Sequence, residues 1–411
     1  MLVRFLLVPC LATAVPAAAQ DLTLADAVAR ATERHPALRA ELHVLEAAEA
    51  KASLDALAPS MTFGGELENV GGTGAVSGVH GAEATFRVGR VFELGGKRDA
   101  RRALGAADVD RQRARLELRR LDLVTEVTRR FVELLERQAL LTLAEGEIAL
   151  AKNLRDAVAY RVERAASPES DLELAEIAVA RAELELEHAV HELASARVAL
   201  AVTFDVAVPD FARAAGDLEP LPPTEPLATW QERVTANAEQ HGFAFDAAQL
   251  EAQRRLARTV RAPDVTTTLG VRRLEALDDQ ALVLSVSVPF GTATRATLAE
   301  ARVDAEKEAL DERRRAAQLE SWRSVFATFQ ELLHAKTEFD KLGSTMIPAA
   351  EAAVKLTQRG YDEARFSFVQ LTQARTVAVE LRKQRLAAAA RYHRLRAELE
   401  RATAPLDGAT P

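Results

Sequence analysis

The chain contains the same order of segments twice, and this duplication limits its possible folds more than any other feature. Residues 33–36 open an Ala-rich helical run that ends at Ala58-Pro59, and residues 239–242 open a similar run that ends at Ala262-Pro263. Each Ala-Pro pair is followed by two short alternating segments, a glycine-containing turn and a very long charged run. A fixed order that recurs within one chain indicates a repeat architecture. We therefore expect two structural repeats rather than independent domains.

The boundaries of these repeats follow from proline, glycine and the change of period along the chain. The first repeat is expected over residues 21–203, with a helix over 35–57, strands at about 61–69 and 82–92, a long helix over 98–164 and a helix over 168–202. The second is expected over 230–403, with a helix over 243–260, strands at about 265–273 and 281–290, a long helix over 295–358 and a helix over 366–403. Proline-rich residues 204–229 link the repeats, and residues 404–411 form a C-terminal tail.

The four short segments alternate between apolar and polar residues. In the first, Phe63 and Leu67 alternate with small or charged residues, and in the last, Leu282, Leu284 and Val286 alternate with smaller or polar ones. Period two predicts strands with one apolar face, and each is about as long as a tilted strand that crosses a bilayer. A water-soluble sheet with one wet face is the alternative, and the absence of Trp and Tyr from the strands supports it.

Four strands cannot close into a barrel by themselves. In lipid, an open sheet edge leaves backbone groups without hydrogen bonds at a cost of several kcal/mol each, on the order of 2–7. If the strands span a membrane, several copies of the chain must therefore share one barrel. Two copies would give an eight-stranded barrel filled by its side chains, whereas three would give twelve strands and an open lumen.

Residues 1–20 have the pattern of a secretory signal, with Arg4, a short apolar run over 5–15 and Ala17-Ala18-Ala19 as small residues before a cleavage site. Cys10 raises the alternative of a lipidated signal, although the residues before it are not small. It is the only cysteine among 411 residues, which excludes an intramolecular disulfide framework. The signal predicts export of the chain.

Composition excludes several classes of protein. With 28% charged residues spread along the chain, a bundle of membrane-spanning helices is ruled out. The formal net charge of −8 disfavours nucleic-acid binding. The charge instead fits long helices exposed to water: the run over 98–164 would extend about 100 Å as one helix, and Leu116, Leu123, Val127 and Leu134 fall near heptad spacing.

Together these segments resemble the TolC-type outer-membrane factor family, the exit ducts of Gram-negative efflux and secretion systems, and within it the cobalt–zinc–cadmium branch. The resemblance covers nearly all of residues 21–404 and rests on residues 22–28, 35–38, 68–72 and, most specifically, 92–98, Phe-Glu-Leu-Gly-Gly-Lys-Arg. Glycine in this last motif allows a sharp passage from strand to helix. The residues at the two such turns are Gly95, Gly96, Lys97, Arg98, Pro289 and Gly291.

The resemblance implies a homotrimer in the outer membrane. Its long antiparallel coiled-coil helices would form an α-barrel reaching into the periplasm, and its four strands per subunit would complete a shared twelve-stranded β-barrel in the lipid. It also implies two partners, a periplasmic adaptor (membrane fusion) protein and an inner-membrane pump of the RND type. No cofactor is implied.

The resemblance further implies that the periplasmic ends of the helix pairs form a gate and meet the adaptor. The family pattern has a glycine at each tip and an aspartate six residues later. Here Ala165 precedes Asp171, and Ala364 precedes Gln370, so a strongly acidic gate is not expected at that level. The candidate gate or adaptor residues are Arg161, Arg164, Ala165, Glu169, Asp171, Asp362, Glu363, Ala364, Arg365, Gln370 and Gln373.

Three functions remain open on the sequence. The first is an outer-membrane exit duct, passive and not enzymatic, for heavy-metal cations or alternatively for drugs or type I secretion. The second is a soluble periplasmic coiled-coil adaptor, and the third a secreted enzyme, for which no catalytic motif is found. His188 and His191, three residues apart on one helix, form either a metal-binding pair or a solvent-facing pair, and we assign no metal site.

Overall fold

The computed structural model describes residues 21–406, which are mainly helical with one small antiparallel sheet. This confirms the predicted fold class. The signal expected at residues 1–20 lies outside the described residues, as does most of the expected tail. None of the helices within 21–406 combines the length and apolar character that a membrane-spanning helix requires.

The chain divides into two compact units that do not coincide with the two repeats. The helical unit comprises Arg120–Leu227, Val325–Arg401 and the segment that ends at Pro36. The sheet unit comprises Ala37–Arg119, Ala228–Ser324 and the segment that begins at Ala402. Each unit takes elements from both repeats, because the two long helical runs contribute to both.

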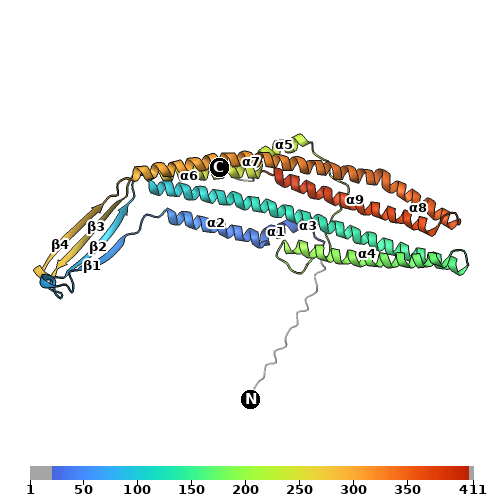
Figure 1. Cartoon of the computed structure of the whole chain (residues 1–411), viewed down its shortest axis with the longest axis horizontal. Helices are drawn as coiled ribbons and strands as arrows, with labels where there is room; N and C mark the ends of the chain where they lie inside the picture. Colours follow the sequence, from blue (N-terminus) through green and yellow to red (C-terminus); the bar gives the residue numbers. More distant parts are fainter. Residues whose placement is uncertain (1–20, 407–411) are drawn as a thin grey trace, which may run out of the picture. The chain divides into compact units, whose positions relative to one another are not determined.

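The sheet consists of one hairpin from each repeat. Strands β1 (Thr62–Glu68), β2 (Glu83–Phe92), β3 (Val265–Leu274) and β4 (Asp279–Ser287) pair antiparallel in that order. Figure 1 shows the blue hairpin β1–β2 beside the orange hairpin β3–β4, joined through the β2–β3 pair. Strand β4 ends before Pro289, earlier than the expected residue 290, because proline has no N–H to donate to a ladder.

The sheet has two chemically different faces. Large apolar side chains of one face are exposed, with Phe63 76%, Phe86 61%, Leu282 73% and Leu284 69% exposed. The opposite face carries glycine, threonine, serine and charged residues. Phe63 and Phe86 stack on the apolar face, with ring centroids 6.5 Å apart. Alternation along each strand places these residues as the period-two pattern predicts.

The helices of the sheet unit are α2 (Pro36–Asp55), the first part of α3 (Lys97–Glu163), α5 (Leu227–Thr235), α6 (Ala238–Thr259) and the first part of α7 (Thr292–Lys341). The expected start of a helix at residue 243 differs from the structure. Helix α6 begins at Ala238 because the Asn237 side chain accepts a hydrogen bond from the Gln240 N–H at 2.9 Å and caps the helix.

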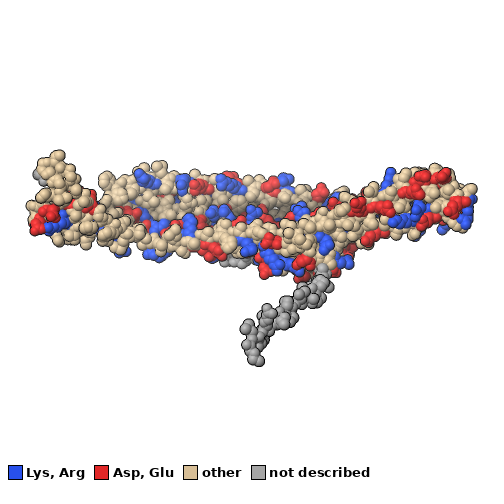
Figure 2. Space-filling model, turned by 90° about the horizontal axis from the view of Figure 1, so that it is seen from below, with Lys and Arg blue, Asp and Glu red and all other residues tan. Residues whose placement is uncertain are grey.

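The helical unit contains α1 (Leu24–Arg34), the rest of α3 and α7, α4 (Glu169–Val202), α8 (Ile347–Asp362) and α9 (Phe368–Thr403). Of the heptad positions, Leu123, Val127 and Leu134 are buried, whereas Leu116 is only partly so. Acidic and basic side chains are interspersed over the faces visible in Figure 2. The helices therefore bury a narrow apolar seam and leave mixed charge toward solvent.

The single helix expected over 295–358 is interrupted. Helix α7 ends at Lys341, a π-helical segment covers Leu342–Met346, and α8 carries Pro348 in its first turn. A proline in an α-helix interior lacks the N–H for the i−4 bond and clashes with that carbonyl. The wider π-helical turn just before Pro348 changes this bonding pattern, so the chain continues as a helix after one irregular turn.

Residues 204–229, expected as a linker, are held against α9 within the helical unit. The Tyr392 hydroxyl donates to the Pro222 carbonyl at 2.7 Å, and Arg385 pairs with Glu219 at 2.8 Å. Arg385 reaches Glu219 by crossing the π-helical segment, where a Cβ on Gly343 would lie 2.9 Å from its Nε. The linker is thus a packed part of the helical unit.

Candidate functional site

Two turns at one end of the helical unit carry the candidate gate residues. The α3–α4 turn closes with hydrogen bonds from Ala165 N to Val162 O and from Ala166 N to Arg161 O. The α8–α9 turn closes with the same pattern, from Ala364 N to Tyr361 O and from Arg365 N to Gly360 O. Both are Schellman caps, which require a left-handed residue after the helix. Ala165, at φ 57°, and Ala364, at φ 56°, take that conformation, which glycine adopts more readily.

The residues six positions after these alanines occupy equivalent places, but one caps its helix and the other does not. Asp171 and Gln370 are each the third residue of the following helix. Gln370 forms a capping box with Ser367: its Oε1 accepts from Ser367 N at 2.9 Å, and Ser367 Oγ accepts from Gln370 N at 3.3 Å. The position equivalent to Ser367 is Pro168, which has no N–H to donate, so the Asp171 carboxylate is not used as a cap.

Asp171 lies partly buried near Arg161. Burial raises the pKa of Asp171 above its ordinary value, and the positive charge of Arg161 opposes this shift. Gln373 lies further along α9 and is exposed. Together with Gln370 and Phe366 it lines a groove of about 340 Å³ between α8 and α9. Gln370 and Gln373 are uncharged, whereas Asp362 and Glu363 are exposed acids at the same turn, so a gate without strong acidity at the level of Gln370 remains a prediction.

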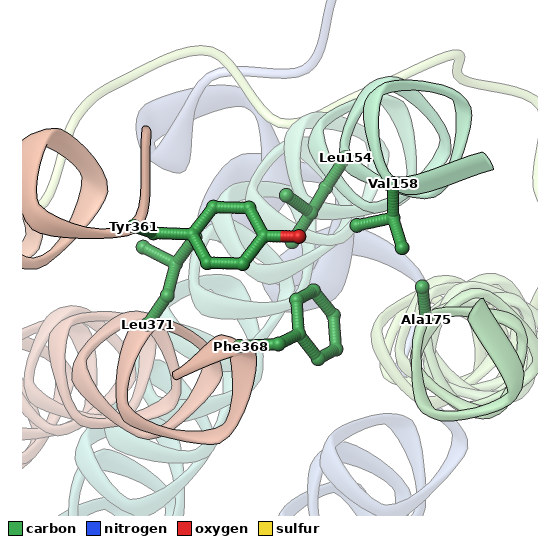
Figure 3. Close-up of a cluster of buried hydrophobic side chains, with 6 residues drawn as sticks. All are labelled: Leu154, Val158, Ala175, Tyr361, Phe368 and Leu371. Atoms are coloured by element: carbon green, nitrogen blue, oxygen red, sulfur yellow. The ribbon is translucent and has the colours of Figure 1, made fainter. Parts of the chain in front are cut away.

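A buried cluster joins the two helix pairs just behind the turns. Figure 3 shows Leu154 and Val158 from α3, Ala175 from α4, Tyr361 from α8, and Phe368 and Leu371 from α9. The rings of Tyr361 and Phe368 meet edge to face at 6.0 Å between centroids. This cluster is the apolar core of the tip.

Tyr361 is also the main polar connection between the turns. Its carbonyl accepts from the Arg161 guanidinium at 3.1 Å, and the guanidinium carbon lies 4.5 Å from its ring centroid. Its hydroxyl lies 3.3 Å from Ser167 Oγ. A cation over an aromatic face is attracted by the ring quadrupole. Arg161, one of the predicted residues, is therefore in direct contact with the other helix pair.

The other predicted tip residues are exposed and do not form one site. Arg164 stacks on Tyr160, with its guanidinium carbon 3.3 Å from the ring centroid. Arg365 pairs with its neighbour Glu363. Asp362 accepts from Gln358 at 3.0 Å, while Glu169 lies exposed in the first turn of α4.

Sequence reasoning missed Tyr361, Phe368 and Ser167. The signal that could have indicated them is the aromatic pair at 361 and 368, seven residues apart across a predicted turn. Gly360 is a second missed signal. A Cβ there would come 2.1 Å from Cδ2 of Phe366, so only glycine lets that ring lie against α8.

The strand-to-helix turn of the first repeat, in the sheet unit, is held by a network around residues 93–101. Gly95 and Gly96 have φ near 73° and 74°, and a Cβ on Gly95 would lie 2.6 Å from Ala262 Cβ. Lys97 pairs with Asp264 at 2.6 Å, just before β3. The motif thus fixes both the turn and its distance from the second repeat.

Two arginines in this network bind the end of α2. Arg98 donates to the Ala56 carbonyl at 2.7 Å, and Arg101 donates to the Asp55 carbonyl at 2.7 Å. Cations suit the free carbonyls of a helix C-terminus. Arg101 also forms a two-pronged ion pair with Glu93, whose hydrogen bonds hold the pKa of Glu93 below its ordinary value. Glu93 belongs to the predicted motif 92–98 but was not singled out as a turn residue, and Arg101 lies beyond the motif.

The second strand-to-helix turn is simpler. Gly291 takes φ 80°, and the Thr292 hydroxyl donates to the Arg261 carbonyl at 2.8 Å. Pro289 lies between β4 and α7 and ends the strand. Within residues 21–406 no group of three or more His, Cys, Asp or Glu is placed to hold a metal ion. His191 instead lies 3.7 Å from Glu187 on the exposed face of α4.

Comparison with known proteins gives the fold a class. No family model matches the chain. A membrane protein from Pseudomonas aeruginosa superposes with a TM-score of 0.77 at 16% identity, covering 95% of this chain and 93% of that one. The MtrE outer membrane channel of Neisseria gonorrhoeae, in its open state, superposes with a TM-score of 0.72 at 17% identity, covering 94% and 91%. The chain has the fold of the TolC-type outer-membrane factors.

Similarity in sequence to one relative links the chain to a particular branch of these proteins. The chain is 29% identical over 306 residues to the cobalt-zinc-cadmium resistance protein CzcC of Cupriavidus metallidurans, covering 73% of this chain and 72% of that protein. The resemblance to the cobalt–zinc–cadmium branch, drawn from residues 92–98 and the other motifs, is confirmed by this relative.

Proposed function

We propose that the chain is the outer-membrane exit duct of a tripartite efflux system, a passive trimeric channel and not an enzyme. The observation that carries this proposal is the four-stranded sheet. Its apolar face is exposed, and its outer strands β1 and β4 each pair on one side only within residues 21–406. In water such a sheet is unfavourable because its apolar face is exposed. In lipid it is unfavourable because the backbone groups at its two edges have no hydrogen-bond partners.

Assembly of several copies removes both problems. Pairing of β4 of one copy with β1 of the next buries the edges, and lipid covers the apolar face. Three copies give twelve strands, enough for an open lumen lined by the polar face. The helices would then extend into the periplasm, and the proposed localisation is the outer membrane.

The two turns of the helical unit are the proposed gate and adaptor contact. The cluster around Tyr361 and Arg161 joins the α3–α4 and α8–α9 pairs of one subunit, so separation of these pairs would disrupt it. An adaptor that binds the exposed turn residues could thereby couple the duct to an inner-membrane pump of the RND type.

The proposed cargo is heavy-metal cations, which rests on the CzcC relative. Deletion of the gene should lower tolerance of zinc, cobalt or cadmium in cells that lack a redundant duct. Unchanged metal tolerance together with lower drug tolerance would assign the duct to drug export instead.

The membrane assignment is tested at two adjacent strand residues. Leu284 lies on the apolar face near the middle of its strand, and Ser285 lies on the polar face. Leu284→Arg should destabilise the assembled channel by about 2–4 kcal/mol if it faces the bilayer midplane, and Ser285→Arg by much less. Equal effects in detergent-resistant trimer assays, or recovery of the wild-type chain in the water-soluble periplasmic fraction, would overturn the proposal.

A further inference from the structure

The polar face of the sheet has its charges concentrated at one level. The rows of paired residues nearest the hairpin loops hold four acids and two bases, and the rows nearer the helices hold only Thr, Ser, Gly and Val. The charged residues are Glu66, Glu68, Glu83, Asp279, Arg87 and Arg272. We call these six residues the charged band.

Arg272 is the central cation of the charged band. Its three guanidinium nitrogens donate to Thr85 Oγ1 at 2.9 Å, to Glu83 at 2.7 Å and to Glu68 at 2.9 Å. The side chain therefore lies across three strands, from β3 over β2 to β1. Thr85 beneath it is only 1% exposed.

This geometry solves an electrostatic problem created by the register. Glu68 and Glu83 are direct cross-strand partners in the β1–β2 hairpin. Like charges placed opposite each other destabilise a pair of strands. Arg272 reaches both carboxylates and neutralises their repulsion, while Arg87 pairs with Glu66 in the neighbouring rows.

Glycine keeps the second arginine close to the sheet. Arg87 is paired with Gly64 on β1 and Gly270 on β3. A Cβ on Gly270 would lie 3.0 Å from the Cβ of Arg87, so the absence of a side chain at Gly270 leaves room on the polar face of the sheet for the arginine. Both arginines thus form ion pairs with carboxylates on the same face of the sheet.

We propose that the charged band makes the channel prefer cations, and that Arg272 limits this preference by neutralising Glu68 and Glu83. The inference rests on the proposed function, because only a closed barrel turns the polar face into a lumen. Rings of carboxylates raise the local concentration of cations, and rings of arginine favour anions. With four acids and two bases per chain, the band is acidic, and each subunit repeats it at the same level.

The experiment measures the K⁺ over Cl⁻ permeability ratio of the purified full-length chain in planar bilayers under a KCl gradient. Wild type should give a ratio above one. Arg272→Gln should raise the ratio, because it exposes two carboxylates per subunit to the lumen. Glu83→Gln should lower it, because Arg272 then has only Glu68 to neutralise.

Arg273 provides a matched control. It is the next residue on β3, lies on the opposite face and pairs with Asp278 near the hairpin loop. Arg273→Gln removes the same charge from the chain but should leave the ratio unchanged. Equal shifts from Arg272→Gln and Arg273→Gln, or a wild type that prefers Cl⁻, would overturn the inference.

Two further outcomes separate this inference from the proposed function. If Arg272→Gln does not assemble, Glu83→Gln still tests the band, and an unchanged ratio in that variant overturns the inference while the channel stands. If the wild-type chain forms no conducting channel at all, the proposed function fails and the inference fails with it.

Discussion

The α3–α4 and α8–α9 turns have the same backbone and different side-chain chemistry. Both end the first helix with an alanine in the left-handed conformation and the same pair of hydrogen bonds. They differ at the start of the second helix, where one has Ser367 with Gln370 and the other has Pro168 with Asp171. The comparison teaches that the residue before the helix decides whether the third helical residue is a cap or is left for other contacts.

The largest expected effect comes from removing the contact that joins the two turns. Tyr361 is 4% exposed and touches Arg161, Ser167 and Phe368. Tyr361→Ala should destabilise the tip by about 3–5 kcal/mol, as loss of a buried aromatic ring does. Hydrogen exchange of amides in both turns measures this local stability.

The control for this prediction is Tyr160, which is 57% exposed and stacks with Arg164. Tyr160→Ala should change amide exchange by less than about 0.5 kcal/mol. Similar losses at both tyrosines would mean that the buried cluster does not hold the turns together.

The second prediction concerns the cap that only one turn has. Ser367→Ala removes the acceptor for the Gln370 N–H and should destabilise the start of α9 by about 1 kcal/mol. Ser170→Ala, in the first turn of α4, should have little effect. If Ser367→Ala lowers hydrogen-exchange protection at the start of α9 and Ser170→Ala leaves protection in α4 unchanged, the difference between the turns is supported. Equal losses of protection in the two helices would contradict it.

The third prediction tests the feature that the turns share. Ala165→Gly and Ala364→Gly should each relieve left-handed strain of about 1–2 kcal/mol, offset in part by the greater entropy of glycine in the unfolded chain. A net gain of up to about 1 kcal/mol is expected in both turns. Ala157→Gly, inside α3, should instead cost about 1 kcal/mol, and a loss at the two turn positions as well would show that they are not strained.

The smallest effect is a pH dependence of opposite sign in the two turns. Burial raises the pKa of Asp171 above 3.8, so the folded state holds its proton more tightly than the unfolded state. Stability therefore falls as pH rises from 3.8 through the raised folded value, and stays lower above it. Asp171→Asn should stabilise the tip at pH 7 by less than about 0.5 kcal/mol, because the carboxyl is only partly buried and solvent screens its interactions.

The matched variant is Gln370→Glu. A carboxylate in the capping box at a helix N-terminus is favoured in its charged form, so this variant should become more stable as pH rises. Unfolding is followed from pH 3 to pH 7 for the wild type, Asp171→Asn and Gln370→Glu. The difference between wild type and Asp171→Asn gives the slope due to Asp171, and the difference between Gln370→Glu and wild type gives the slope due to Glu at position 370. Slopes of the same sign would contradict the assigned roles.

The sequence predicted the features that depend on local order. Alternation along the strands placed Phe63 and Leu284 on one face, and glycine in residues 92–98 placed the strand-to-helix turn. The capping box was also readable from Ser367 and Gln370, but the family pattern directed attention to Gln370 as a gate residue. The pattern Ser367 to Gln370 indicates a helix cap, which is a local structure, but Gln370 was assigned to the gate.

The sequence could not predict contacts between distant segments. Tyr361 meets Arg161 and Ser167 across about 200 residues of chain, and no periodicity encodes that meeting. Arg101 is recognisable as a partner of the α2 C-terminus only when the end of α2 is known to lie beside the start of α3. Gly343 and Pro348 signalled an irregular helix, but not that the irregularity is a π-helical turn.

The π-helical segment has a consequence for the rotational phase of α8. One π-helical turn holds an additional residue compared with an α-helical turn, so every residue after Met346 is rotated by about 100° relative to an uninterrupted helix. Tyr361 lies on α8, and its contact with Arg161 depends on this rotation. Deletion of a single residue at Gly343 would remove the extra residue of this turn and turn Tyr361 away from α3, and it would also restore the clash that Pro348 makes in a regular helix. The irregular turn therefore acts as a spacer that sets which face of α8 the α3–α4 pair meets.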